Sequence, residues 1–274
     1  MTMKKLGIIA GSGALPICLV QACEQVKRPY FVVGLKDCLA KDAFGKGTPL
    51  AWIRLGAVGK GIKLLKKNGV EEVVMIGAVK RPSFSGLIPD WKCLKLLLRH
   101  GKKALGDDAL LKILIKELEK EGFKVVGIDA ILPHLLIKKG VYGRMIPTTQ
   151  DTSDIKRGIQ VAKKLGEADV GQAVIVQQGL VLAVEGIEGT DALIHRSKAL
   201  RRKGGRGVLV KIAKPQQDRR ADLPTIGPNT VQSVSEAGLA GIAVQADSVL
   251  FSEAEKAVKL ANQLGIFIIG VDVK

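Results

Sequence analysis

A chain of 274 residues, 47% of them hydrophobic, can bury a sizeable core, and its length favours two domains of moderate size. Aromatic residues make up only 4%, which argues against a base-stacking surface, and no stretch of roughly 18 uncharged apolar residues is present to span a membrane. The net charge of +17 is concentrated in residues 1–146, where 26 Lys and Arg against 12 Asp and Glu give +14. Such a surface attracts phosphorylated substrates, anionic headgroups and polyanions alike.

The start of the chain places two lysines and an apolar run ahead of Cys23, which imitates a secretory or lipoprotein signal. Gly11, Gly13 and Pro16 sit badly in a signal helix, but they suit a turn between a buried strand at Leu6–Ala10 and a helix. We therefore expect a strand-to-helix turn at this point.

The four cysteines lie in the first third of the chain and form no CxxC pair. This spacing indicates neither a zinc site nor a disulfide framework, and reduced thiols are typical of the cytosol. We therefore expect a cytoplasmic protein. The cysteines are Cys18, Cys23, Cys38 and Cys93.

Short apolar runs alternate with helical patterns in the first half, as in βαβ units that build a parallel sheet. The expected strands are Leu6–Ala10, Phe31–Gly34, Val73–Gly77 and Val125–Ile128. The expected helices are Leu15–Lys27, Gly59–Asn68 and Ala109–Glu121. The prediction is an α/β fold with a Rossmann-like, parallel-sheet nucleotide-binding domain at residues 1–146.

A further helix is predicted at Lys92–Lys103, and one of its faces is basic. In one interpretation this face is only solvated, and in the other it contacts a membrane or a lipid phosphate. The cations on it are Lys92, Lys95, Arg99, Lys102 and Lys103.

The pattern breaks at Gly140–Pro147, so a second, mixed α/β catalytic domain is predicted at residues 147–274. Capping residues from Asp151 precede a helix that ends near Leu165. Ala173–Gln177 and Leu180–Glu185 are predicted to form a hairpin through Gly179. A helix at Thr190–Arg202 and a strand at Val208–Ile212 follow.

Gly11-Ser12-Gly13-Ala14-Leu15-Pro16 follows the first predicted strand directly. A glycine-rich turn lets backbone N–H groups approach a diphosphate and aims the positive end of a helix at it. Pro16 stands where a dinucleotide site would have another glycine, and Asp37 is a candidate for a ribose hydroxyl. The open alternatives are phosphate binding through Gly11, Ser12, Gly13 and Leu15, or a purely structural turn.

The segment from Lys214 to Gly227 concentrates charged residues in one irregular loop after the strand at Val208–Ile212. Carboxylates at this spacing can share Mg²⁺ or another divalent metal, while cations neutralise phosphate oxygens, as phosphoryl transfer requires. The alternative is a surface loop whose charges pair in water. The candidate catalytic residues are Asp222, Asp218, Lys214, Arg219 and Arg220, with Asp222 and Asp218 as metal ligands and Thr225 and Gly227 as substrate contacts.

Acids and hydroxyls also gather at two predicted helix starts, where simple capping competes with ligand binding. Glu185 and Glu188 add more acids to the second start than one cap needs. The three histidines are isolated in sequence, and no GxSxG turn supports a serine hydrolase. The candidate substrate-binding residues at these starts are Thr148, Thr149, Gln150, Asp151, Gly189, Thr190 and Asp191.

Three motifs together resemble the UDP-2,3-diacylglucosamine diphosphatases of lipid A biosynthesis, the type unrelated to metallophosphoesterases. They are GSGALP, TTQDTSDI with the following GQAVIVQQGLVLAVEGIEGTDALIHR, and KPQQDRRADLPTIGPNT. The resemblance covers essentially the whole chain and is densest from Pro147 to Thr230.

The resemblance implies two tethered α/β domains with substrate between them, and Mg²⁺-dependent hydrolysis of UDP-2,3-diacylglucosamine to UMP and 2,3-diacylglucosamine 1-phosphate. It makes the acid of RxDxP, Asp222, the likeliest essential residue, with Asp218 as a second ligand or water orienter. A basic surface would allow peripheral contact with the anionic inner membrane. A homodimer is compatible with the sequence.

Three rival functions use the same features differently. A nucleotide-binding oxidoreductase would share the first-half topology but lacks the third glycine. A nucleic-acid-binding protein would explain the charge, but few aromatic residues and no binding motif speak against it, so no nucleic acid is expected. A non-catalytic, regulatory sugar-nucleotide-binding protein would differ from the enzyme only in lacking turnover.

Overall fold

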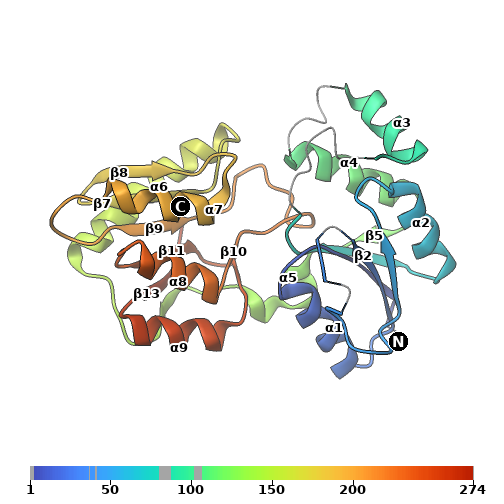
Figure 1. The fold of residues 1–274 in the computed structure, drawn as a ribbon, viewed down its shortest axis with the longest axis horizontal. Coiled ribbons are helices and arrows are strands. Elements are labelled where there is room, and N and C mark those ends of the chain that lie inside the picture. The colour runs from blue at the N-terminus through green and yellow to red at the C-terminus, as the bar shows by residue number, and fades with distance from the viewer. Residues whose placement is uncertain (1–2, 37, 41, 80–87, 102–106, 274) are drawn as a thin grey trace. The chain divides into compact units, whose positions relative to one another are not determined.

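The computed structural model describes residues 3–36, 38–40, 42–79, 88–101 and 107–273 (Figure 1). Asp37, Lys102 and Lys103, which the sequence singled out, lie outside these residues. The chain forms two compact units: unit 1 comprises Met1–Leu132 and Asp218–Asp222, and unit 2 comprises Pro133–Gln217 and Leu223–Lys274.

The first division between the units lies after Leu132, before the stretch at Gly140–Pro147. The reason is β6 (Gly140–Tyr142), which pairs antiparallel with β13 (Phe267–Val271) in the sheet of unit 2. The chain passes between the units twice more, because Asp218–Asp222 belongs to unit 1.

Unit 1 is built on a five-stranded parallel sheet in the order β3-β2-β1-β4-β5, which reverses direction beside β1 as in doubly wound folds. The predicted Rossmann-like parallel sheet is confirmed. The strands are β1 (Leu6–Ala10), β2 (Tyr30–Leu35), β3 (Leu50–Ile53), β4 (Glu72–Ile76) and β5 (Lys124–Val125). The helices are α1 (Leu15–Gln25), α2 (Val58–Lys67), α3 (Trp91–His100), α4 (Asp107–Lys120) and α5 (Ile128–Ile131).

Strand residues of both parities are buried in this sheet, because helices cover both of its faces. Leu6 and Ile8 of β1 are fully buried, and so is the next strand residue of that parity, Ala10. On the other face, Val73 packs in one core cluster with Leu118 of α4. The strand predicted at Val125–Ile128 ends at Val125 because Ile128 begins α5, and β3 was not predicted.

Unit 2 is built on a six-stranded mixed sheet in the order β6-β13-β11-β9-β7-β8, which confirms the predicted second α/β class. β7 (Ala173–Gln177) and β8 (Leu180–Val184) form the predicted hairpin, and β9 (Val208–Lys211), β11 (Gly241–Gln245) and β13 run parallel. A separate parallel pair joins β10 (Thr225–Ile226) to β12 (Leu250–Phe251). The helices are α6 (Thr149–Glu167), α7 (Gly189–Ser197), α8 (Pro228–Glu236) and α9 (Ala254–Leu264), with short 3-10 turns η2 (Pro133–Leu135) and η3 (Lys198–Leu200).

Alternate residues of β7 enter different cores, as the period of a strand requires. Ala173 and Ile175 pack with residues of α7, α8 and α9, whereas Val174 and Val176 pack with residues of α6. α6 approaches the sheet closely at Gly158, where an added Cβ would lie 2.5 Å from Cγ2 of Val210. Of the helices described, none is both long and apolar enough to cross a membrane.

Candidate active site

The glycine-rich turn after β1 is held against the end of β4. The Gly11 amide donates to the Ile76 carbonyl at 2.8 Å, and the Ser12 amide and hydroxyl both donate to the Ala78 carbonyl at 2.8 Å. A Cβ on Gly11 would lie 2.7 Å from the carbonyl oxygens of Gly77 and Ala78. Two of the turn's amides are therefore used inside the fold, and close backbone approach explains Gly11.

The start of α1 is the part of this turn that keeps donors for a ligand. Gly13 is exposed and has a φ of 102°, a conformation that favours glycine. The N-cap residue, Ala14, makes no side-chain capping bond, and Pro16 lies in the first turn of the helix. An anion at this strand end would therefore meet the first turn of α1 around Gly13 and Leu15.

The candidate catalytic loop begins on unit 2, against the end of α6. The Nζ atom of Lys214 lies 2.8 Å from Oδ1 of Asp169, and Nε2 of Gln216 donates to the Gly166 carbonyl at 2.6 Å. The Lys214 side chain is mostly buried. The ion pair and the burial of its side chain therefore hold the Lys214 ammonium group in one position.

The tip of the loop, Asp218–Asp222, packs on unit 1. Nη2 of Arg219 lies 3.0 Å from Oδ2 of Asp129 in α5, and Nη1 of Arg220 lies 2.7 Å from Oε1 of Glu119 in α4. Ala221 packs against the core of the unit. The ion pairs of Arg219 and Arg220 and the apolar packing of Ala221 together hold the tip of the loop on unit 1.

Asp218 is engaged through both carboxylate oxygens by Arg220. Nε of Arg220 donates to Oδ1 at 3.0 Å, and Nη2 donates to Oδ2 at 2.8 Å. These hydrogen bonds hold the pKa of Asp218 below its ordinary value and raise the pKa of Arg220. A metal at Asp218 would have to share oxygens that the guanidinium already binds.

Asp222 follows this fork and is exposed. Within the described residues, no three His, Cys, Asp or Glu side chains are grouped to hold a metal ion. Mg²⁺ does not need such a cage, because it commonly binds one or two carboxylates together with substrate phosphates and water. The donors present therefore fit a metal that Asp222 shares with a phosphorylated substrate.

The loop ends at β10. Lys211, which was not among the predicted site residues, holds this end of the loop. Lys211, at the end of β9, is buried, and its Nζ donates to the Thr225 carbonyl at 3.1 Å. Gly227 is the N-cap of α8, and its amide lies 3.4 Å from Oγ1 of Thr230. A lysine inside the apolar run of β9 was the signal for this contact.

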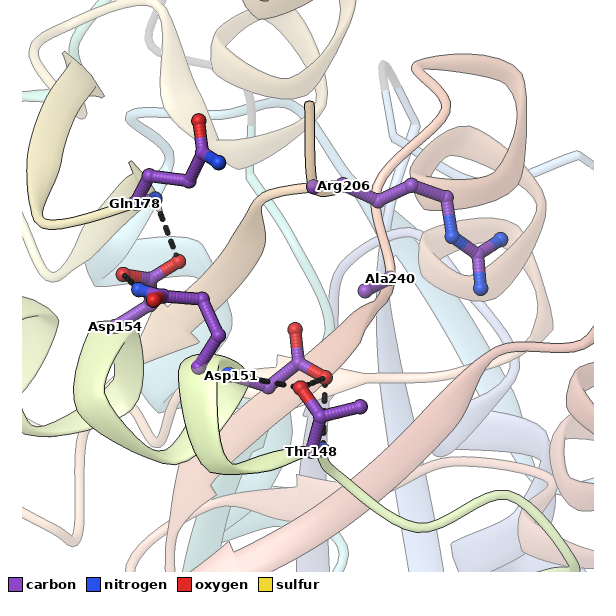
Figure 2. A pocket seen from close by; sticks show the side chains of 8 residues that line it. Thr148, Asp151, Asp154, Gln178, Arg206 and Ala240 are labelled. Atoms are coloured by element: carbon purple, nitrogen blue, oxygen red, sulfur yellow. Dashed lines mark hydrogen bonds between the residues drawn. The ribbon is translucent and has the colours of Figure 1, made fainter. Parts of the chain in front are cut away.

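Three of the four predicted residues at the start of α6, Thr148, Gln150 and Asp151, line a pocket of about 200 Å³ (Figure 2). Thr148 is the N-cap: its hydroxyl donates to Oδ2 of Asp151 at 2.7 Å and accepts from the Asp151 amide at 3.2 Å. Figure 2 shows Arg206 extending past Ala240. Thr149 begins the helix. Gln150 and Arg206 join Thr148 and Asp151 in the pocket lining, so capping explains Thr148 and Asp151 while the pocket leaves room for a ligand.

Asp154 was not among the predicted site residues, yet it is the most buried acid of this region, with 1% exposure. Its carboxylate accepts from the Gln178 amide at 2.8 Å (Figure 2) and from the Gly179 amide at 2.7 Å, at the turn of the β7–β8 hairpin. Nε2 of Gln150 adds a third bond at 3.0 Å. Asp154 thus ties the hairpin to α6.

The two acids before α7, Glu185 and Glu188, each bind a different partner within the fold. Glu185 is buried and accepts from the Gln172 amide at 3.0 Å and the Thr190 hydroxyl at 2.7 Å. Oε1 of Glu188 lies 2.8 Å from Nη2 of Arg196, which lowers the pKa of Glu188. Of the predicted substrate contacts here, Gly189 has a φ of 80° and Asp191 is exposed in the first turn.

Comparisons with known proteins match both halves of the chain. Residues 5–135 match the LpxI N-terminal domain, and residues 138–269 match the LpxI C-terminal domain. The chain is 40% identical over 279 residues to the UDP-2,3-diacylglucosamine pyrophosphatase LpxI of Caulobacter vibrioides, and the match covers 98% of both chains.

Among solved structures, N5-carboxyaminoimidazole synthase from Aspergillus clavatus aligns with 73% of this chain and 44% of its own, at 13% identity and a TM-score of 0.24. A likeness this low supports no argument about fold or function. The family matches, by contrast, extend over both domains and confirm the resemblance carried by the sequence motifs. The chain belongs to the LpxI family.

Proposed function

We propose that this protein is a hydrolase of lipid A biosynthesis that cleaves the diphosphate of UDP-2,3-diacylglucosamine. The products are UMP and 2,3-diacylglucosamine 1-phosphate. The observation that carries the proposal is the 40% identity, over 98% of both chains, to a relative named as the pyrophosphatase for this substrate. The loop with Asp222 supplies the matching chemistry.

In this reaction one water adds across the bridging P–O–P bond. The water oxygen forms a bond to one phosphorus, and the bridging oxygen leaves with the other phosphate. Negative charge grows on the phosphate oxygens, and fixed cations stabilise it without reorganising. We assign that role to Lys214, Arg219 and Arg220, each of which an acid of its own unit holds in place.

We assign Asp222 as the metal ligand because its carboxylate is exposed next to these cations in sequence. A bound Mg²⁺ or similar divalent cation would supply charge neutralisation on the diphosphate. Asp218 has a different role in this proposal: bound by Arg220, it shapes the turn that presents Asp222. The Asp222 amide lies 3.3 Å from the Asp218 carbonyl, which closes that turn.

We further assign substrate contacts to backbone donors at helix starts. In unit 1 these are the residues around Gly13 and Leu15 at the start of α1, whose N-cap makes no side-chain capping bond. In unit 2 we assign Gln150, which lines the α6 pocket. The cysteines Cys18, Cys23, Cys38 and Cys93 form no disulfide, which suits the cytoplasm, where we place the reaction.

The direct test is release of UMP from UDP-2,3-diacylglucosamine by the purified full-length protein, with Mg²⁺ or with a chelator. A UDP-sugar without acyl chains is the matched control substrate. Metal-dependent UMP release from the acylated substrate supports the proposal. Tight binding of the substrate without turnover, under every divalent metal tried, would indicate a regulatory sugar-nucleotide-binding protein instead.

A further inference from the structure

Helix α3 has one buried face and one exposed face that mixes large apolar side chains with cations. Cys93 and Leu96 are buried. On the opposite face Trp91 is 69% exposed and Leu98 73% exposed. Lys95 and Arg99 are exposed beside them, so the outer face follows the i, i+4, i+7, i+8 spacing of a helical stripe.

Among the residues that the structure describes, no acid pairs with Lys95 or Arg99 of this stripe. The described acids around α3 are engaged elsewhere. Glu121, the residue after α4, binds Lys92 and Lys66, and Oε1 of Glu117 in α4 lies 3.1 Å from Nζ of Lys92. This finding removes Lys92 from the predicted basic face, because its side chain pairs with α4.

Asp90, another described acid beside the helix, is used as its cap. Its carboxylate accepts from the Cys93 amide at 2.9 Å and from the Lys60 amide in α2 at 3.1 Å. α2 packs against α3 and adds exposed lysines of its own. They are Lys60, Lys63 and Lys67. The described surface around α3 therefore carries excess positive charge.

The stripe pairs its aromatic and cationic groups. Nζ of Lys95 lies 5.2 Å from the centre of the Trp91 ring, and Ile88, just ahead of the helix, is 60% exposed. Trp91 and Leu98 lie on one face of the helix and expose apolar surface to water between the cations Lys95 and Arg99. Trp is favoured at the boundary between headgroups and acyl chains, while Lys and Arg extend towards lipid phosphates.

We propose that the exposed face of α3 docks unit 1 on the headgroup layer of an anionic bilayer, with the helix lying in the plane of the interface. Trp91 and Leu98 enter the boundary of the acyl chains, and Lys95 and Arg99 bind lipid phosphates. Unit 1, Met1–Leu132 with Asp218–Asp222, has 25 Lys and Arg against 14 Asp and Glu, and this charge of +11 complements such a surface. The proposal concerns lipid binding alone and does not depend on catalytic turnover.

The chain offers a clean spectroscopic test, because it contains two tryptophans, Trp52 and Trp91. In Trp52→Phe, the fluorescence reports on Trp91 alone. Vesicles of equimolar phosphatidylglycerol and phosphatidylcholine should shift its emission to the blue, and lipids brominated near the headgroup should quench it. Circular dichroism of the variant without vesicles checks that it folds.

Co-sedimentation with the same vesicles tests the two kinds of side chain separately. Trp91→Ala with Leu98→Ala, and Lys95→Glu with Arg99→Glu, should each weaken partitioning about tenfold or more. The matched controls are Ile187→Ala, which removes an apolar side chain that is 92% exposed, and Lys259→Glu on the exposed side of α9. Both controls should partition as the wild type does.

Three results would overturn the proposal. One is an unchanged Trp91 emission in the presence of anionic vesicles. Another is equal partitioning of the α3 variants and their controls. The last is a change of solution mass on Trp91→Ala in the absence of lipid, which would show that the face binds a second copy of the chain.

Discussion

Arg220 binds Asp218 as a fork, with Nε 3.0 Å from Oδ1 and Nη2 2.8 Å from Oδ2, although only Arg219 separates the two residues. The guanidinium also reaches Glu119 of α4 at 2.7 Å. One side chain therefore sets the local turn and anchors it to unit 1. Of the two acids in this turn, Asp222 is the more exposed.

Replacing Arg220 by Lys should reduce kcat/KM for UMP release about tenfold, because an ammonium group cannot form the two parallel hydrogen bonds. Arg220 lowers the pKa of Asp218, so its loss should raise that pKa and move the acid limb of the pH–rate profile to higher pH. Arg157→Lys, on the exposed side of α6, is the control. Equal rates and equal profiles for the two variants would show that the fork is dispensable.

Glu121 should make unit 1 sensitive to acid. Hydrogen bonds from Lys66 and Lys92 lower the pKa of Glu121 from 4.5 to about 2. A carboxyl whose pKa is lower in the folded state stabilises the fold fully above its unfolded pKa, and this contribution is lost as pH falls towards the folded value. The window therefore runs from pH 4.5 down to about 2.

The measurement is the free energy of unfolding in urea for the wild type and Glu121→Gln across that window. The wild type should be the more stable protein at neutral pH, and the difference should shrink as the pH approaches about 2. A difference that stays constant with pH would mean that the carboxylate charge contributes nothing.

Gly11→Ala should destabilise the protein by about 1–3 kcal/mol, because the new Cβ must displace backbone rather than a flexible side chain. The carbonyl oxygens of Gly77 and Ala78 lie 2.7 Å from where it would stand. Gly45→Ala is the control, since its Cβ meets no heavy atom within 4 Å. Urea unfolding of both variants compares them, and equal midpoints would refute close packing at this turn.

Asp154→Ala should cost about 3 kcal/mol of unfolding free energy, because it leaves the amides of Gln178 and Gly179 without their acceptor in the hairpin turn. Gln150→Ala removes one donor to the same carboxylate and leaves both amides satisfied, so its effect should be smaller. Thermal and urea unfolding give the comparison. An effect of Gln150→Ala as large as that of Asp154→Ala would place the stability elsewhere.

Local patterns predicted much of the fold. The bounds of β1 and β7 agree with the predicted Leu6–Ala10 and Ala173–Gln177, because each is an apolar run ended by glycine or polar residues. The predicted caps from Asp151 were three residues late: α6 begins at Thr149 with Thr148 as its N-cap, and Asp151 lies inside the first turn, where its side chain returns to the cap.

Local patterns could not predict contacts between residues that are far apart in the sequence. Arg219 and Asp129 are 90 positions apart, and nothing in either segment indicates the partner. The same holds for Lys92, which its own helix pattern places among solvated cations but which pairs with α4. Assignment of Asp218–Asp222 to unit 1 depends on such contacts, so a sequence boundary near Gly140–Pro147 could not include it.

The most direct test of the central claim is the rate of Mg²⁺-dependent UMP release by Asp222→Asn, which keeps the shape of the side chain but removes its charge. We expect a loss of about 100-fold or more with the fold intact, because the metal would lose its carboxylate ligand. Asp272→Asn, whose carboxylate pairs with Lys139 on the surface of unit 2, should keep the wild-type rate. A wild-type rate for Asp222→Asn would contradict the assignment of this loop as the active site.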